Sequence, residues 1–305
     1  MQPEPSGHTL ELFPLGVRTR IHSTDAGLLR IAADAYAVWA EPPVAAEDEP
    51  ASVTIRLSVD AVDDGGRLDV RVDGPDLAMR GAGVDGRADA VRREAWCAVS
   101  PSVAADAHRA GDVLDTLVLF LVTRAGRVPL HASGFVAGET AFVLAGPSGT
   151  GKSTLALAAQ RRGLHVLSDD TVYVQLSPVP RVWGFPRPIH VFPEQAPPAD
   201  DSSLRLRSGK LKAAVPLASG PSRRSFADRS ILVLLERGSE VRIEAVSVDQ
   251  AVERMLDLLE PGFDHFRDQL PAAVRAVAMS GAYRLTLSAD PEEAIAALLA
   301  LGPTT

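Results

Sequence analysis

The segment Gly146-Pro-Ser-Gly-Thr-Gly-Lys-Ser-Thr154 decides the fold of this chain. It fits the pattern G-x-x-x-x-G-K-[S/T], whose glycines let the backbone turn tightly around phosphate groups. The apolar stretch 141–145 before it predicts a strand, and residues 155–162 after it predict a helix that ends at Gly163. A strand, a glycine loop and a helix in this order predict a P-loop that binds a nucleoside triphosphate.

The residues of this loop have distinct expected roles. Successive backbone N–H groups and the start of the helix would attract phosphate oxygens. Lys152 would reach the β- and γ-phosphates of ATP, and the Ser153 hydroxyl would bind Mg²⁺. Lysine occurs at only three positions, so a chance match to the pattern is improbable. The residues expected to contact the nucleotide are Gly146, Pro147, Ser148, Gly149, Thr150, Gly151, Lys152, Ser153 and Thr154.

Two adjacent carboxylates follow the next predicted strand. Residues 164–168 form a short apolar stretch that ends in Asp169 and Asp170. We expect this strand to run parallel and close to strand 141–145, with its carboxyl end facing the phosphates. Neighbouring strand residues alternate in direction, so one aspartate would face the metal or the nucleophile and the other a nearby loop. Paired acids also serve as turn formers, but the phosphate loop favours a functional interpretation.

His131 is a candidate site residue because of hairpin register. Gly138-Glu139 is a suitable two-residue turn between two apolar stretches. In such a hairpin His131 lies opposite Gly146, where the phosphate loop begins. It could contact the γ-phosphate, assist an aspartate, cap the loop or serve only as a structural residue.

The remaining sequence predicts an α/β protein with two domains. Residues 1–105 read as a β-rich α+β domain of unknown role, and residues 106–305 as the P-loop catalytic domain. In the first part, strands 53–59 and 68–72 are expected to pair as a hairpin through Asp63–Gly66. In the second part, residues 176–228 are rich in proline and predict a lid or a substrate loop. The expected helices are 26–38, 103–127, 247–260, 268–279 and 291–301, and the further strands are 129–137, 231–235 and 283–287.

The composition excludes several classes of protein. A net charge of −8 without a basic run argues against nucleic-acid binding. Cys97 is the only cysteine, so no internal disulfide can form, which favours a reducing compartment. The N-terminal residues show no secretory pattern, and no apolar stretch reaches the roughly 20 residues of a membrane span. We therefore expect a cytoplasmic protein without membrane contact. The oligomeric state stays open, a homo-oligomer included.

Three matched segments make the chain resemble the C-terminal domain of the HPr kinase/phosphorylase superfamily, and its HPr-kinase-related members in particular. They are Leu130-His-Ala-Ser133, Gly146–Thr154 and Leu167-Ser-Asp-Asp170, in the family's order and with similar separations. The resemblance implies a PEP-carboxykinase-like P-loop kinase core. It implies Asp169 as the general base on a hydroxyl, Asp170 as support for the metal and Lys152, and His131 as a residue lining the site. A weaker match implies that Arg229 contacts the transferred phosphate.

The resemblance covers about residues 125–290 and has gaps. The family's glutamate that helps to hold the metal has no counterpart in Arg181–Pro188, and residues 1–105 show no match. We therefore expect an ATP- and Mg²⁺-dependent kinase acting on a serine or other hydroxyl of a protein, a peptide or a small molecule, with phosphorylase activity left open. The alternatives are a nucleotide-binding adaptor with weak or no kinase activity and a simple ATPase. A Ras-like GTPase and an ABC-type ATPase are disfavoured because their N-K-x-D and L-S-G-G-Q motifs are missing.

Overall fold

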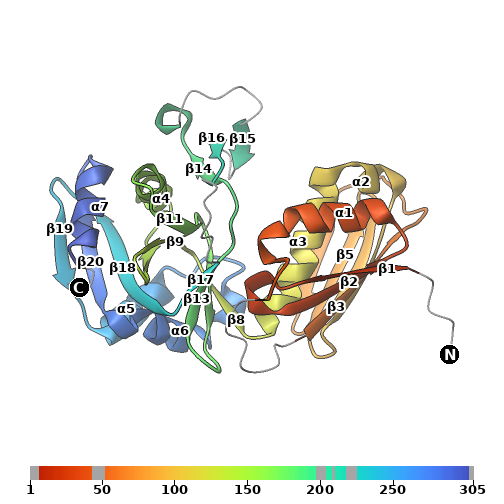
Figure 1. The fold of residues 1–305 in the computed structure, drawn as a ribbon, viewed down its shortest axis with the longest axis horizontal. Helices are drawn as coiled ribbons and strands as arrows, with labels where there is room; N and C mark the ends of the chain where they lie inside the picture. The colour runs from red at the N-terminus through yellow and green to blue at the C-terminus, as the bar shows by residue number, and fades with distance from the viewer. Residues whose placement is uncertain (1–6, 43–51, 197–203, 208–209, 218–224, 302–305) are drawn as a thin grey trace. The chain divides into compact units, whose positions relative to one another are not determined.

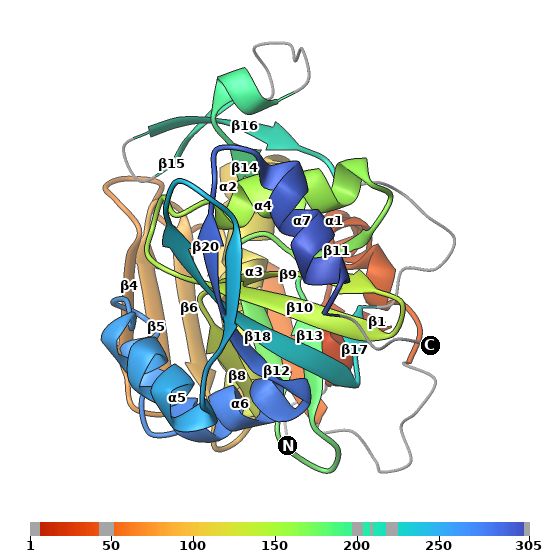
Figure 2. The same ribbon diagram turned by 90° about the vertical axis from the view of Figure 1, so that its left-hand side faces the viewer.

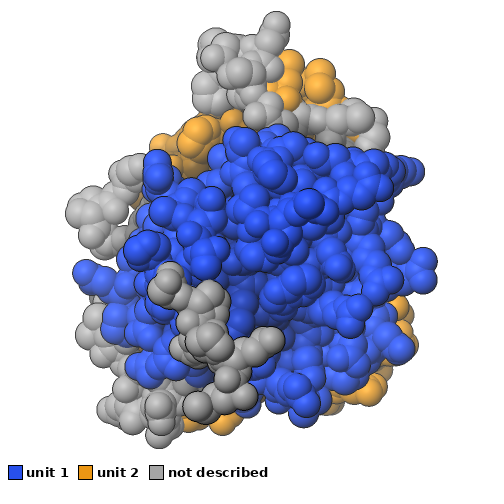
Figure 3. Space-filling model, turned by 90° about the vertical axis from the view of Figure 1, so that its right-hand side faces the viewer, with its two compact units in different colours: residues 1–127 blue, residues 128–305 orange. Residues whose placement is uncertain are grey.

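A computed structural model describes residues 7–42, 52–196, 204–207, 210–217 and 225–301. The chain is mixed α/β and divides into two compact units, Met1–Arg127 and Val128–Thr305 (Figure 3). The expected boundary after residue 105 therefore lies too early. The reason is helix α3 (Ala107–Arg124), which packs on strands of the first unit. Among the described residues, no helix is long and apolar enough to span a membrane.

The first unit is a seven-stranded sheet in the order β1-β2-β3-β7-β6-β5-β4 with helices on one face (Figure 1). The strands are β1 (His8–Leu12), β2 (Arg18–Ser23), β3 (Ser52–Val59), β4 (Asp69–Asp73), β5 (Asp76–Gly81), β6 (Val84–Asp89) and β7 (Glu94–Val99). The helices are α1 (Ala26–Ala35), α2 (Pro101–Ala105) and α3, with short 3-10 turns at Pro14–Gly16 and Ala37–Trp39.

Alternating side chains explain why helices cover only one face of this sheet. In β3, Val53, Ile55 and Leu57 are buried, whereas Arg56 between them is exposed. Period-two alternation of this kind places apolar residues under the helices and polar residues on the opposite face. Helix α3 supplies the covering apolar surface, with Leu117 fully buried.

Two local expectations in this unit are wrong. Strands β3 and β4 do not pair with each other, because β3 pairs in parallel with β2 and β7, whereas β4 pairs with β5. The single helix expected over residues 103–127 is two helices. Asp106 interrupts it with extended backbone angles and caps α3 by accepting hydrogen bonds from His108 N and Arg109 N.

The second unit contains three sheets. The largest has the order β11-β9-β10-β18-β20-β19, the next β17-β13-β12-β8 and the smallest β14-β16-β15. The first sheet comprises β9 (Ala132–Ala137), β10 (Thr140–Ala145), β11 (His165–Ser168), β18 (Arg229–Arg237), β19 (Arg242–Ala245) and β20 (Ala282–Leu287). The other strands are β8 (Arg127–Leu130), β12 (Val172–Gln175), β13 (Arg181–Gly184), β14 (Ile189–Val191), β15 (Leu204–Arg207), β16 (Lys210–Val215) and β17 (Phe226–Ala227).

Helices cover both faces of the six-stranded sheet (Figure 2). Residues of α5 (Val248–Asp257) and α6 (Leu270–Val277) share one hydrophobic core with Val143. Residues of α4 (Lys152–Arg161) and α7 (Pro291–Leu299) share the other core with Leu144. Because both of its faces are covered, all six residues of β10 are buried.

The hairpin that leads into the glycine loop, residues 146–151, has the expected register. Residues of β9 and β10 pair antiparallel from Thr140 with Ala137 to Ala145 with Ala132, and Gly138 in the turn has a φ of 60°. The strand before the aspartates behaves differently from the expectation. Strand β11 pairs with β9, so it runs in the direction of β10 but is separated from it by β9.

The proline-rich segment 176–228 is more ordered than a single loop. Its described part contains strands β13 to β17 and a 3-10 turn at Pro193–Gln195. Strand β13 pairs with β12 and β17, and β16 pairs with β14 and β15. Residues 197–203, 208–209 and 218–224 of the expected lid lie outside the described residues.

Candidate functional site

The glycine loop connects the carboxyl end of β10 to the amino end of α4. Pro147, Ser148 and Gly149 are exposed, so a ligand can reach the loop from solvent. Gly149 and Gly151 have φ values of 83° and 121°, which side chains rarely allow. A Cβ on Gly146 would lie 3.0 Å from the carbonyl oxygen of Leu235, so the loop packs closely against β18.

Helix α4 is fixed at both ends by its sequence. Its first residue is Lys152, directly after Gly151, so its amino end opens onto the loop. At its other end Gly163 adopts a left-handed conformation with a φ of 78°. Gly163 N donates to Gln160 O, and Leu164 N donates to Ala159 O, the pair of bonds of a Schellman motif. The helix dipole therefore points its positive end at the exposed loop.

Lys152 is buried at the centre of the loop. Its Nζ donates to Gly146 O at 2.7 Å and to Pro147 O at 3.4 Å. Burial lowers the pKa of the Lys152 ammonium, and the carboxylates of Glu260, Asp170 and Asp169 oppose that shift. The lysine therefore lies within electrostatic reach of three acids.

Asp169 is buried and is bonded through only one of its carboxylate oxygens. Its Oδ2 accepts a hydrogen bond of 2.8 Å from the backbone N–H of His190, whose ring Nδ1 lies 3.8 Å away. Its Oδ1 has no hydrogen-bond partner among the described residues. A buried carboxylate oxygen without a partner costs free energy, so this atom is available for a ligand to satisfy.

His131 lies between two carboxylates. Its Nδ1 is 3.7 Å from Asp170 Oδ1, and its Nε2 is 3.5 Å from Glu260 Oε1. The ring of Phe263 packs edge-on against it, with 5.6 Å between the ring centroids. Burial lowers the pKa of His131, as does the Lys152 ammonium, whereas the carboxylates of Asp170, Glu260 and Asp169 oppose that shift. Asp170 itself is mostly exposed and points to the open side of the cluster.

The structure does not bring Arg229 to this cluster. Arg229 begins β18 and pairs with Thr140 at the amino end of β10, whereas the glycine loop follows Ala145 at the carboxyl end of β10. Five residues of strand separate the two ends by about 17 Å. At the carboxyl end of β18, Arg237 instead donates to Gly149 O from Nη2 at 2.9 Å and from Nε at 3.3 Å.

The structure thus brings together the glycine loop, Lys152, His131 and the aspartate pair, and it adds three residues that the sequence did not predict. Glu260 follows α5, His190 lies in β14, and Arg237 ends β18. All three reach the site through long-range packing. Only Arg237 could have been found from the sequence. It follows the predicted strand 231–235, and this strand pairs with β10.

The residues present suit a triphosphate and a magnesium ion. The exposed loop, the helix start, Lys152 and Arg237 offer positive charge and N–H donors to phosphates. Mg²⁺ usually takes only one or two carboxylates from the protein and completes its shell with water and phosphate oxygens. Ser153 and Asp170 would hold such an ion. The described residues contain no group of three or more histidine, cysteine or acidic side chains arranged to hold a metal by themselves.

Comparisons with known proteins find distant structural similarity to solved structures but no match in sequence. No family model matches the chain, and no curated protein matches its sequence. Among solved structures, the HPr(Ser) kinase/phosphatase from Coxiella burnetii matches with a TM-score of 0.28 and 12% sequence identity. The match covers 56% of this chain and 93% of that chain. The relationship is distant, so we base the functional proposal on the geometry of the site.

Proposed function

We propose that this chain is an ATP- and Mg²⁺-dependent kinase that transfers the γ-phosphoryl group to a serine or another hydroxyl. The acceptor would be a protein, a peptide or a small molecule. The observation that carries the proposal is Asp169, a buried carboxylate with one oxygen fixed by His190 N and the other unsatisfied among the described residues. A buried carboxylate held in this way, with Lys152 within electrostatic reach, supports the proposal of Asp169 as the general base.

The chain's own residues account for each part of the reaction. The loop amides, Lys152 and Arg237 would hold the phosphates and offset the charge that develops on them. Asp169 would accept the hydroxyl proton while the acceptor oxygen bonds to the γ-phosphorus and the bond from that phosphorus to the β,γ-bridging oxygen breaks, leaving ADP. Bound Mg²⁺ would supply further charge neutralisation. Phosphorolysis would use inorganic phosphate as the acceptor. A phosphate oxygen would bond to the phosphorus of the phosphorylated substrate, the bond from that phosphorus to the substrate oxygen would break, and protonated Asp169 would return the proton to that oxygen, leaving pyrophosphate and the free hydroxyl.

A transfer assay tests the proposal. Wild-type protein, Mg²⁺ and γ-labelled ATP are incubated with serine-containing peptides, carrier proteins and small hydroxyl compounds, and labelled acceptor and free phosphate are measured separately. We expect labelled acceptor, and a rate about 10²- to 10⁴-fold lower for Asp169→Asn with nucleotide binding kept. The matched control is Asp34→Asn, which makes the same change at an exposed residue of α1 and should leave the rate unchanged.

A nucleotide-binding adaptor is the second candidate. It is favoured by the segment Arg181–Pro188, which contains no acid where the HPr kinase family has a glutamate that helps to hold the metal. ATP binding without transfer or hydrolysis, unchanged by Asp169→Asn, would support the adaptor and contradict the kinase. Phosphate release without any labelled acceptor would indicate a simple ATPase.

A further inference from the structure

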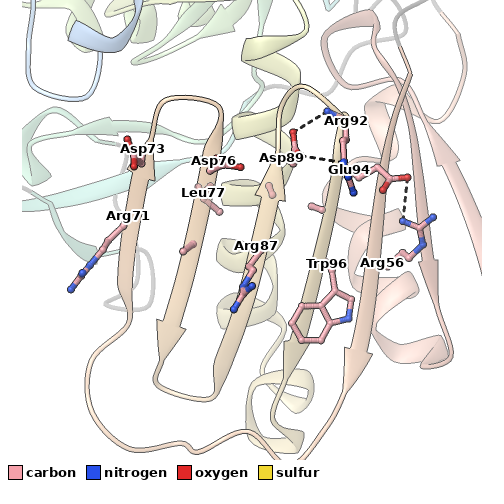
Figure 4. Close-up of a pocket in the computed structure, with 13 residues that line it drawn as sticks. Arg56, Arg71, Asp73, Asp76, Leu77, Arg87, Asp89, Arg92, Glu94 and Trp96 are labelled. Atoms are coloured by element: carbon pink, nitrogen blue, oxygen red, sulfur yellow. Dashed lines mark hydrogen bonds and ion pairs between the residues drawn. The ribbon is translucent and has the colours of Figure 1, made fainter.

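The open face of the first unit's sheet carries charges in ordered rows (Figure 4). One row is acidic and crosses four neighbouring strands. Its residues are opposed pairwise in the strand register, Asp73 with Asp76, Asp76 with Asp89 and Asp89 with Glu94. Within the described part of the chain, ion pairs are seen for two of these four residues. Asp89 pairs with Arg92 at 3.6 Å, and Glu94 pairs with Arg56 at 3.5 Å. The negative charge of the row is therefore only partly neutralised.

The next row on the same face is basic and aromatic. Arg71 lies opposite Ala78, Ala78 opposite Arg87, Arg87 opposite Trp96, and Trp96 opposite Arg56. Trp96 is 44% exposed, an unusual position for a large aromatic side chain. Arg87 is exposed, and no ion pair of it is seen among the residues that the structure describes. The two rows line a shallow hollow of about 580 Å³.

The adjacent acidic and basic rows restrict the charge pattern of any partner that binds this face. An acidic peptide on the basic row would also lie beside the acidic row, where like charges repel it. A partner that satisfies both rows must present acids and bases in parallel lines about 7 Å apart, the spacing of alternate residues in a strand. The chain's own sheet face has this pattern. A two-fold axis between the rows and parallel to them would place the acidic row of each copy against the basic row of the other.

We propose that this face docks a second copy of the chain, with the two sheets packed face to face. In that arrangement Asp89 faces Arg87 of the second copy. Asp76 faces Ala78 of the second copy. Because the side chain of Ala78 is small, Asp76 has space between Arg71 and Arg87 of that copy. Trp96 lies near the centre as an apolar anchor. Five strands about 4.8 Å apart and two rows about 7 Å apart cover roughly 340 Å² per copy, well below a standard specific interface. The dimer should therefore be weak and salt-sensitive.

Charge reversal tests the proposal and needs no nucleotide, so its outcome is independent of the kinase assay. The oligomeric state of the full chain is measured by sedimentation between about 1 and 100 µM, the range in which a weak dimer changes its population. In this arrangement Asp73 faces Arg71 of the second copy. Arg71→Glu and Asp73→Arg therefore each oppose like charges at both symmetry-related contacts, so each variant should dissociate at least about tenfold more readily. Both side chains are exposed, so the fold should be unaffected. Arg30→Glu makes the same charge change on α1, on the helix-covered side of the sheet, and should leave the dimer intact.

Mixing the two variants is the decisive step. Glu at position 71 of one chain then faces Arg at position 73 of the other, and the native Asp73 and Arg71 form the second contact. We expect a heterodimer to form where each variant alone is monomeric. A wild-type chain that stays monomeric across the range would overturn the proposal and leave this face to a different partner. A dimer that neither charge reversal weakens, or variants that do not pair when mixed, would overturn it as well.

Discussion

The two large sheets of the molecule place charge in different environments. In the first unit, helices cover one face, and the arginines and acids of the other face stand in solvent, as Arg56 and Glu94 do. In the second unit, helices cover both faces, and the ionisable groups Lys152 and Asp169 are buried where strands end. Burying a charged group costs much more free energy than leaving it in water. A buried charge therefore persists only where partner groups or a bound ligand offset that free energy.

This difference separates two kinds of candidate function. Asp169 is held by one backbone N–H and keeps one oxygen unsatisfied among the described residues, which is the environment of a catalytic or ligand-binding group. The exposed rows of the first unit are fully hydrated and suit only a surface that meets a partner. Substitutions in each unit test this difference between the two sheets.

The largest effect is expected in the covered face of the first unit. Leu117 in α3 is fully buried, so Leu117→Ala should destabilise this unit by about 2–5 kcal/mol. Amide hydrogen exchange in β3 and β7 measures the change locally. Arg87→Ala on the open face is the control and should shift stability by less than about 0.5 kcal/mol. Equal losses of stability in the two variants would mean that the helix-covered face and the open face contribute equally to the stability of this unit.

A glycine next to the aspartates should give the next largest effect. A Cβ on Gly184 would lie 2.2 Å from Leu167 O, two residues before Asp169. Gly184→Ala should therefore destabilise the second unit by about 1–3 kcal/mol and reduce phosphoryl transfer by displacing Asp169. A Cβ on Gly111 in α3 would meet no described atom within 4 Å beyond the backbone of its own helix. Gly111→Ala should accordingly stabilise the chain, by up to about 1 kcal/mol. Urea unfolding of both variants checks the opposite signs.

The two arginines of β18 provide a matched pair within one strand. Arg237→Ala removes a cation at the phosphate loop and should weaken ATP binding about tenfold, the value of one charge-assisted hydrogen bond. Arg229→Ala, at the amino end of the same strand, should leave the affinity unchanged. Calorimetric titration with ATP measures the affinity of both variants. The opposite ranking would restore Arg229 as the phosphate contact and remove Arg237 from the site.

The smallest effect concerns pH and the buried lysine. Burial lowers the pKa of Lys152 in the folded chain below the ordinary value of 10.5. Folding therefore costs free energy while Lys152 is charged, and the cost disappears as pH rises through the lowered pKa. The unfolding free energy of the wild type relative to Lys152→Met should rise from neutral pH towards about pH 10. Urea unfolding at several pH values measures this difference, and a flat or falling difference would contradict the burial of this charge.

Local sequence patterns predicted the parts of the site that depend on short-range geometry. The glycine loop, the helix with its end at Gly163 and the β9–β10 register follow from turn and capping residues. These rules act over a few residues and need no knowledge of distant packing. The mixed α/β class followed in the same way from alternating strand and helix patterns.

Long-range packing explains what the sequence did not predict. Helix α3 looked like the start of the second domain, but its apolar face is buried against the first sheet. Strand β9 lies between β10 and β11, an order that periodicity does not encode. Glu260 was missed because no local pattern marks a carboxylate that reaches His131 from a loop after α5.

The most direct test of the kinase proposal is a titration of the protein with ATP in the presence and absence of Mg²⁺. We expect Mg²⁺-dependent binding with a dissociation constant between about 1 µM and 1 mM, the usual range for enzyme substrates. The same titration of Lys152→Met should show binding weakened at least about tenfold in a chain that remains folded. Absence of binding at millimolar ATP, or equal affinity in the variant, would contradict the assignment of the loop as a triphosphate site.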